Sequence, residues 1–193
     1  PLLTVSNVSR DFIKSLDLVA KFLNRLGQDH REEIVHAVDE VSFEVFKGEV
    51  VGIVGESGCG KSTLGKMVAG ILPPTTGQVH FHSANKSEGA TPDDLKTQMI
   101  FQDPFSSLNP KLKIGFLLRE MWNLHQSEPA TTAKLNKLLD EVGLPANTLD
   151  KYAHEFSGGQ RQRIAIARAL AADPEMLIAD EPVSALDVSI QAQ

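Results

Sequence analysis

The chain of 193 residues has little that would cross-link it or carry it through a membrane. Cys59 is its single cysteine, so no disulfide can form within the chain, and a reducing cytosol is the expected compartment. No run approaches the roughly 20 consecutive apolar residues that cross a bilayer, and the first residues do not have the pattern of a signal peptide. Any contact with a membrane is therefore expected to be peripheral.

Positive charge is also scarce, since 19 Lys and Arg stand against 25 Asp and Glu and the formal net charge is -6. A protein that binds nucleic acid by neutralising phosphates over a broad surface needs the opposite balance, so we expect no nucleic-acid partner. A chain of this length suits one domain with room for an inserted subdomain.

What the sequence does contain is a glycine-rich segment, GESGCGKST at residues 55–63, between two apolar segments. Residues 50–54 predict a buried strand. Residues 64–72 predict a helix that ends at Gly70 and Pro73-Pro74, with an apolar stripe made of Leu64, Met67, Val68 and Ile71. A strand, a glycine loop and a helix in this order are typical of a phosphate-binding loop, and the order argues against a chance glycine-rich turn.

The chemistry of this loop points to a nucleotide with magnesium. Glycines permit backbone conformations in which successive amide N–H groups face anionic oxygens, and the helix start adds its positive dipole end. Lys61 is expected to reach the β- and γ-phosphates, and the Ser62 hydroxyl is expected to ligate Mg²⁺. The nucleotide contacts predicted for the loop are Gly55, Ser57, Gly58, Cys59, Gly60, Lys61, Ser62 and Thr63.

A second candidate site follows residues 176–179, a continuous apolar run that predicts a parallel strand covered on both faces. Two carboxylates come directly after it and are therefore expected at the carboxyl edge of the sheet, where ligands bind in open α/β folds. Asp180 is expected to hold Mg²⁺, and Glu181 to polarise the attacking water. On its own the run is an ordinary strand end, and the phosphate-binding loop is what favours the catalytic interpretation.

Periodicity predicts the remaining elements. Residues 2–8, 41–46 and 79–81 are expected to be strands, the first two in an antiparallel layer beside a buried sheet. The polar stretch 83–94 is expected to be a surface loop. Helices are expected at 114–124, 131–142 and about 157–172.

Further motifs give the chain a family resemblance. Residues 156–160, FSGGQ, followed by RQRIAIARAL, resemble the signature sequence of ATP-binding cassette (ABC) ATPases. Phe156 and the preceding His154-Glu155 resemble the subunits that energise oligopeptide, dipeptide and nickel uptake. Residues 100–110, IFQDPFSSLNP, are similar to the Gln-loop of that subfamily, and DEPVSALDVSIQAQ from Asp180 resembles its Walker B end and D-loop.

The resemblance implies an α/β fold, namely a P-loop NTPase (RecA-like) core with an antiparallel β layer. It implies one nucleotide-binding domain over residues 1–193, with a helical subdomain inserted at approximately 103–160. Ser157 is a good helix N-cap, and Gly158 and Gly159 expose amide N–H groups, so this turn is either a second anion site or only a well-capped helix start. The resemblance favours the anion site: Ser157, Gly158, Gly159 and Gln160 would contact ATP held by a second cassette in a head-to-tail dimer, with Asp187 at the dimer seam.

Other roles also come from the resemblance. Gln102 matches the glutamine that senses magnesium and γ-phosphate. The expected metal ligands are Ser62, Gln102 and Asp180, and the expected catalytic residues are Glu181, Gln102 and Lys61.

Phe12 is the best match to the aromatic residue that stacks on adenine. However, Phe12 also fits the start of an amphipathic helix with Leu16, Val19, Leu23 and Leu26, so packing is the alternative. His80 and His82 alternate along a strand, and without further ligands nearby a solvated strand face is favoured over a metal pair.

The resemblance finally implies partners and a location. The expected partners are a second ATPase subunit, two membrane permease subunits and, indirectly, an extracytoplasmic substrate-binding protein, and the expected location is the cytoplasmic face of the inner membrane. A soluble cassette protein outside transport and a catalytically inactive nucleotide-binding module are the alternatives. Because the switch histidine and the last core strands of the family are not found before Gln193, we expect a shortened cassette with weak ATP binding and no turnover.

Overall fold

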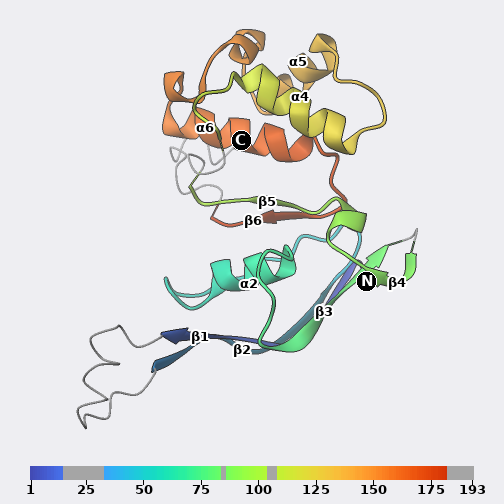
Figure 1. Cartoon of the computed structure of the whole chain (residues 1–193), viewed down its shortest axis with the longest axis vertical. Coiled ribbons are helices and arrows are strands. Elements are labelled where there is room, and N and C mark those ends of the chain that lie inside the picture. Colours follow the sequence, from blue (N-terminus) through green and yellow to red (C-terminus); the bar gives the residue numbers. More distant parts are fainter. Residues whose placement is uncertain (15–32, 84–85, 104–107, 182–193) are drawn as a thin grey trace, which may run out of the picture. The chain divides into compact units, whose positions relative to one another are not determined.

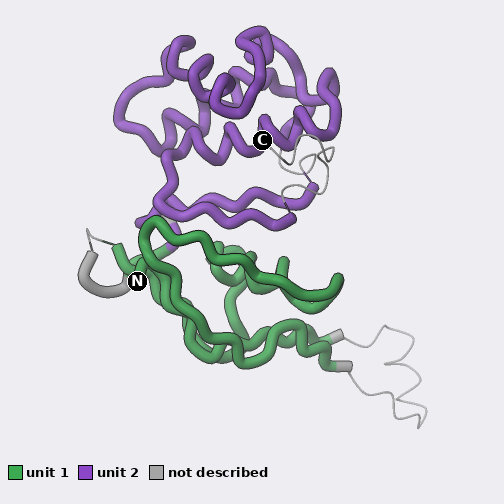
Figure 2. The backbone as a smooth tube through the Cα atoms, turned by 180° about the vertical axis from the view of Figure 1, so that it is seen from behind, with its two compact units in different colours: residues 1–91 green, residues 92–193 purple. Residues whose placement is uncertain are grey.

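The computed structural model describes residues 1–14, 33–83, 86–103 and 108–181. The chain forms two compact units, residues 1–91 and residues 92–193 (Figure 2). Among the described residues, each unit contains a sheet of its own. The division between the units lies between residues 91 and 92 and does not test the helical subdomain predicted at approximately 103–160, which stays a prediction.

Unit 1 is built on an antiparallel sheet with the strand order β2-β1-β3-β4 (Figure 1). Its strands are β1 (Leu3–Lys14), β2 (Glu33–Val45), β3 (Thr76–Ser83) and β4 (Lys86–Ala90). Alternation along β1 places Leu3 and Val5 on one buried face. The predicted strands at 2–8, 41–46 and 79–81 are confirmed as parts of these strands.

Strand β4 lies inside the stretch that we expected to be a loop, so that prediction is wrong for residues 86–90. The strand pairs with β3 through Phe81 and Ala90. Its sequence, KSEGA, has no β-branched or aromatic residue that would signal a strand. Charged residues are nevertheless common at the edge of a sheet, where they discourage further pairing, and β4 is such an edge.

The single helix described in unit 1 is α2 (Lys61–Val68), which contacts β2. Leu64, Met67 and Val68 are buried, as the apolar stripe predicts. Ile71 lies beyond the end of the helix and is exposed, so its assignment to the stripe is wrong. The helix ends before Gly70, as expected.

Residues 50–54 do not form the buried strand that the sequence predicts. No strand is assigned to them, and the side chains of Val50 and Val54 are each 96% exposed. A strand that is buried in a parallel sheet needs a neighbour along its edges to satisfy its amides and cover its side chains. None of the described strands pairs with this segment, so its apolar side chains stay uncovered.

Unit 2 combines a short parallel sheet with a helical core (Figure 1). Its strands are β5 (Gln98–Ile100) and β6 (Leu177–Ala179), which pair in parallel from Gln98↔Leu177 to Ile100↔Ala179. The predicted parallel strand at 176–179 is therefore confirmed. Leu177 is 43% exposed, however, so the expectation that both faces are covered is wrong, because the described sheet has only two strands.

Three helices supply the core of unit 2, and all three were predicted. They are α4 (Ile114–His125), α5 (Thr132–Glu141) and α6 (Gly158–Leu170), with short 3₁₀ turns η1 (Asp93–Leu95), η2 (Ala146–Asp150) and η3 (Ala153–Glu155). Apolar residues at helical spacing, such as Leu117 and Leu118 on α4 and Leu135 and Leu139 on α5, meet Ile164 of α6 in one buried cluster.

Candidate functional site

The phosphate-binding loop of unit 1 has the backbone that an anion site requires. Gly58 and Gly60 have positive φ angles of 84° and 98°, which only glycine adopts readily. At Gly60 a Cβ atom would lie 2.0 Å from the carbonyl oxygen of Ala37, so β2 closes over the loop at the point where α2 begins. The first turn of α2 presents its N–H groups at this end, together with Ser62 and Thr63.

Lys61 folds back over its own loop. Its Nζ donates to the carbonyl oxygens of Gly55 at 3.0 Å and Glu56 at 2.8 Å, and lies 4.0 Å from Cys59 Sγ. The ammonium therefore lies against the carbonyl groups of its own loop. Binding a phosphate would replace carbonyl contacts with stronger, charge-assisted ones.

The carboxyl edge of unit 2 is the edge of the β5–β6 sheet that holds the residues after Ile100 and Ala179. The backbone N–H of Asp180 donates to Ile100 at 2.9 Å and continues the strand pairing to this edge. Here the Nε2 atom of Gln102 donates to the Oε2 atom of Glu181 at 2.8 Å. The prediction that Glu181 lies at a carboxyl edge is thus confirmed, and Gln102 joins it there.

The contact between Gln102 and Glu181 was not predicted, because the sequence revealed the strand before Glu181 but not strand β5, which ends two residues before Gln102. Glu181 has a positive φ angle of 47°, which a non-glycine residue seldom adopts. Such backbone conformations are common at functional sites, where the surrounding structure imposes them.

The signature turn, residues 157–160, starts helix α6 as expected. Ser157 Oγ accepts a hydrogen bond from the backbone N–H of Gln160 at 3.3 Å, and Gln160 Oε1 accepts one from the backbone N–H of Ser157 at 3.1 Å. This reciprocal capping box fixes the first turn. A Cβ atom at Gly158 would meet nothing within 4 Å, so the turn is open to a ligand.

One residue that sequence reasoning missed holds α6 in place. Arg163 Nη1 donates to the carbonyl oxygen of Val142, just past the end of α5, at 3.1 Å. Gly143 makes room for it, because a Cβ atom there would lie 2.5 Å from the same Nη1. A guanidinium at a helix C-terminus also complements the negative end of the helix dipole. The sequence RQR at residues 161–163, directly after FSGGQ, was the signal from which Arg163 could have been found.

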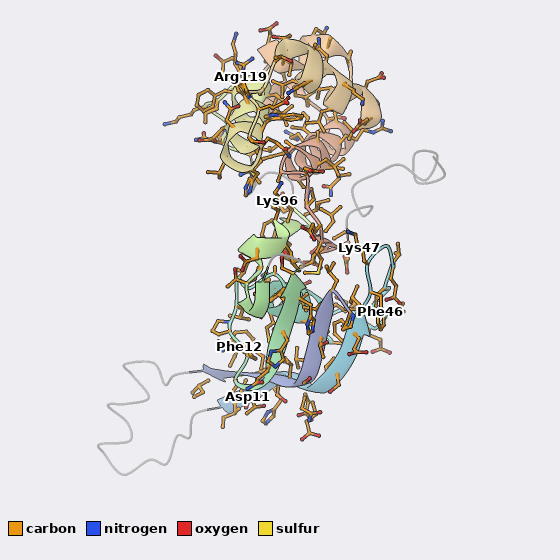
Figure 3. The ribbon with its side chains drawn as sticks, turned by 90° about the vertical axis from the view of Figure 1, so that its right-hand side faces the viewer. Asp11, Phe12, Phe46, Lys47, Lys96 and Arg119 are labelled. Carbon is orange, nitrogen blue, oxygen red and sulfur yellow. The ribbon has the colours of Figure 1, made fainter. Side chains whose placement is uncertain are left out.

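Phe12 lies in strand β1, opposite Val35 of β2, so it does not start a helix and that alternative is wrong for this residue. The other residues of the suggested helix lie outside the described residues. The ring of Phe12 is 41% exposed beside Asp11 (Figure 3), and the guanidinium carbon of Arg10 lies 5.0 Å from the ring centroid. An exposed ring at a strand is compatible with stacking on a base, which stays a prediction.

Two other predictions concern the pair His80 and His82, and Asp187. His80 and His82 are both exposed, with Nε2 atoms 2.8 Å from Gln78 Oε1 and 3.1 Å from Thr4 Oγ1, so the solvated strand face is confirmed. Asp187 lies outside the described residues.

The predicted magnesium ligands fit the ion chemically, since Ser62, Gln102 and Asp180 offer a hydroxyl, an amide and a carboxylate oxygen, which hard cations prefer. Within the described ranges, no three His, Cys, Asp or Glu side chains form a group that would hold a metal by themselves.

Comparison with known proteins decides the family. The family model described as ABC transporter matches residues 38–184. The chain belongs to the ABC transporter family. The predicted family and its P-loop NTPase fold are therefore confirmed.

Three relatives show which members of the family this chain resembles. The chain is 49% identical over 167 residues to the oligopeptide transport ATP-binding protein OppF of Bacillus subtilis (strain 168), covering 82% of this chain and 55% of the relative. It is 52% identical over 166 residues to the oligopeptide transport ATP-binding protein AppF of the same strain, covering 82% and 50%. A putative peptide import ATP-binding protein of Brucella ovis is 48% identical over 169 residues, covering 84% and 53%. The chain thus spans about half the length of these relatives.

Solved structures agree on the fold. A dimeric post-hydrolysis structure of the ATP-binding cassette MJ0796 bound to ADP and Pi has a TM-score of 0.76 at 25% sequence identity, and the match covers 98% of this chain and 78% of that chain. Another dimeric MJ0796 structure, described as a bacterial ABC transporter cassette, has a TM-score of 0.75 with the same identity and coverage.

Among the helices that the structure describes, none has the length and apolar character of a membrane span.

Proposed function

We propose that this chain belongs to the ATP-hydrolysing subunit that drives import of oligopeptides through an ABC transporter, with nickel as the alternative cargo. The observation that carries the proposal is the 48–52% identity to oligopeptide and peptide import ATP-binding proteins. The subunit would work at the cytoplasmic face of the membrane, bound to two permease subunits, with an extracytoplasmic binding protein delivering the cargo.

Nucleotide binding is assigned to the loop of unit 1. Its amide N–H groups, the ammonium of Lys61 and the dipole of α2 would hold the phosphates, and Phe12 would stack on the adenine. The support is the positive φ of Gly58 and Gly60 and the position of Lys61 Nζ over the loop. The remaining predicted contacts, Gly55, Ser57, Cys59, Ser62 and Thr63, belong to the same segment.

Hydrolysis is assigned to the carboxyl edge of unit 2. Glu181 would accept the proton of the attacking water, and Gln102 would report on the γ-phosphate. Bound Mg²⁺, with Ser62, Asp180 and Gln102 as its protein ligands, would neutralise phosphate charge. The hydrogen bond from Gln102 to Glu181 supports a shared role.

Dimerisation is assigned to the signature turn. Ser157, Gly158, Gly159 and Gln160 would contact ATP held by a second cassette, and Asp187 would lie at the seam. The open N-terminus of α6 and the dimeric state of the matched cassette structures support this assignment.

The test is a substitution of Lys61 by Ala in the complete subunit, expressed in cells that depend on it. We expect affinity for a fluorescent ATP analogue to fall by at least tenfold and uptake of a labelled oligopeptide to be lost. Nickel uptake and co-purification of the two permeases are measured in parallel. Peptide uptake that survives the substitution, or a wild-type subunit that co-purifies with no permease, would contradict the proposal.

A further inference from the structure

Gln162, in the second turn of helix α6, is a buried amide whose hydrogen-bonding atoms are unused. Its side chain is 1% exposed, and neither Nε2 nor Oε1 finds a hydrogen-bond partner in the part of the chain that the structure describes. Burying an amide without partners costs folding free energy, whereas methionine would fill the same space without that cost. An unsatisfied amide in this position calls for an explanation beyond packing.

The helical repeat shows which way Gln162 faces. Ile164, Ala167 and Ala171 pack into the helical core of unit 2. At 100° per residue, Gln162 lies on the opposite side of α6, together with Ala165 and Ala169, which are buried but are not part of that core. Since α6 contacts β5, this opposite side faces the sheet.

The direction of α6 brings Gln162 toward the carboxyl edge. The helix ends at Leu170, a short connection leads to the start of β6, and β6 then runs back beneath the helix (Figure 1). The first turns of α6 therefore lie at the end of the sheet where β5 and β6 finish. This is the edge that holds Gln102 and Glu181, while Ser157 caps the same end of the helix.

We propose that Gln162 is a positioning residue that couples the signature turn to the carboxyl edge of unit 2. Its amide donates to and accepts from chain groups at that edge once nucleotide is bound, so the start of α6 and Glu181 take up their working positions together. Ala165 and Ala169, which are buried on the same side of α6, have small side chains that permit close packing of this helix on β5. This inference rests on the proposed ATPase function.

The experiment replaces Gln162 by Met in the complete subunit assembled with its partner cassette. Methionine keeps the length and volume of the side chain and removes its hydrogen-bonding capacity. We expect kcat for ATP to fall at least tenfold while KM for ATP stays within twofold, because the phosphate-binding loop lies in the other unit. The thermal unfolding midpoint without nucleotide is expected to stay equal or rise.

Thr148→Val is the matched control. Thr148 is 0% exposed, and its Oγ1 also has no hydrogen-bond partner among the described residues, but it lies in η2, which contacts α4 and α5. The control should leave kcat and KM unchanged. Gln162→Glu is the rescue variant. Burial raises the pKa of a carboxyl group, and the neutral acid can both donate and accept hydrogen bonds, as the amide does. This variant should retain at least a third of the wild-type turnover.

The outcomes separate the two proposals. A wild-type assembly without ATP turnover contradicts the proposed function. A wild-type assembly that hydrolyses ATP, with Gln162→Met within twofold of it in kcat, overturns the positioning role and leaves Gln162 as packing. If Gln162→Met fails to fold, Gln162→Glu decides: turnover above a third of the wild-type value supports the role, and a lower value overturns it.

Discussion

Replacement of Gly60 by Ala tests whether the close approach of β2 shapes the phosphate-binding loop. Two costs are expected. Gly60 has a φ of 98°, and an L-residue in the left-handed region loses about 1–2 kcal/mol. In addition, the new Cβ would lie 2.0 Å from the carbonyl oxygen of Ala37, so backbone must move, and overpacking of this kind costs about 1–3 kcal/mol. The free energy of unfolding should fall by about 2–5 kcal/mol.

Gly58 supplies the matched control within the same loop. Its φ is 84°, but a Cβ atom there would meet nothing within 4 Å. Gly58→Ala should therefore pay only the conformational cost of about 1–2 kcal/mol. The difference between the two variants, about 1–3 kcal/mol, isolates the contact with β2.

The assay is urea denaturation without nucleotide, followed by far-UV circular dichroism. A fluorescent ATP analogue then reports whether the surviving folded protein binds phosphate. We expect Gly60→Ala to weaken binding more than Gly58→Ala, because it also shifts the start of α2. Equal unfolding midpoints for the two variants would refute the claim that β2 closes over the loop at Gly60.

Three further outcomes are expected. In the complete subunit, Glu181→Gln keeps ATP binding and loses turnover by about 10²–10⁴-fold, because the amide still accepts from Gln102 but cannot take a proton from water. Undiminished steady-state turnover would remove Glu181 from catalysis. Cys59 is exposed in the phosphate-binding loop, so Mg-ATP should slow its alkylation as followed by mass spectrometry, and rates that ignore nucleotide would place the ligand elsewhere. Glu128→Gln probes the contact with Lys134, whose hydrogen bond and positive charge lower the pKa of the Glu128 carboxyl. The stability lost in this variant at neutral pH should therefore vanish as the pH falls through that lowered pKa, and a loss that grows on acidification would contradict this sign.

Local sequence signals were sufficient to predict the helices and the phosphate-binding loop. Ser157 followed by Gly-Gly-Gln predicts a capped helix start, and the structure forms the capping box. Thr131 likewise caps α5 by accepting from the backbone N–H of Lys134. These features depend on residues within one turn of each other, which is why the sequence reveals them.

Long-range pairing could not be read in the same way. Residues 50–54 have the composition of a buried strand, yet burial depends on neighbours that composition cannot supply, and the structure leaves Val50 and Val54 exposed. Strand β4 shows the reverse case, because its polar sequence pairs with β3 at a sheet edge. The contacts of Arg163 with Val142 and of Gln102 with Glu181 join residues 21 and 79 positions apart, and no local pattern encodes such pairs.

A last prediction concerns the packing of helix α6 in unit 2. Helix α6 carries the signature turn at its start, contacts β5 along one side and packs Ile164 into the helical core along the other. Arg163 ties the same helix to the end of α5. A loss of packing at Ile164 is therefore expected to shift the signature turn relative to Glu181 without touching either. Under the proposed function, such a shift would lower turnover more than nucleotide affinity, because the phosphate-binding loop belongs to the other unit.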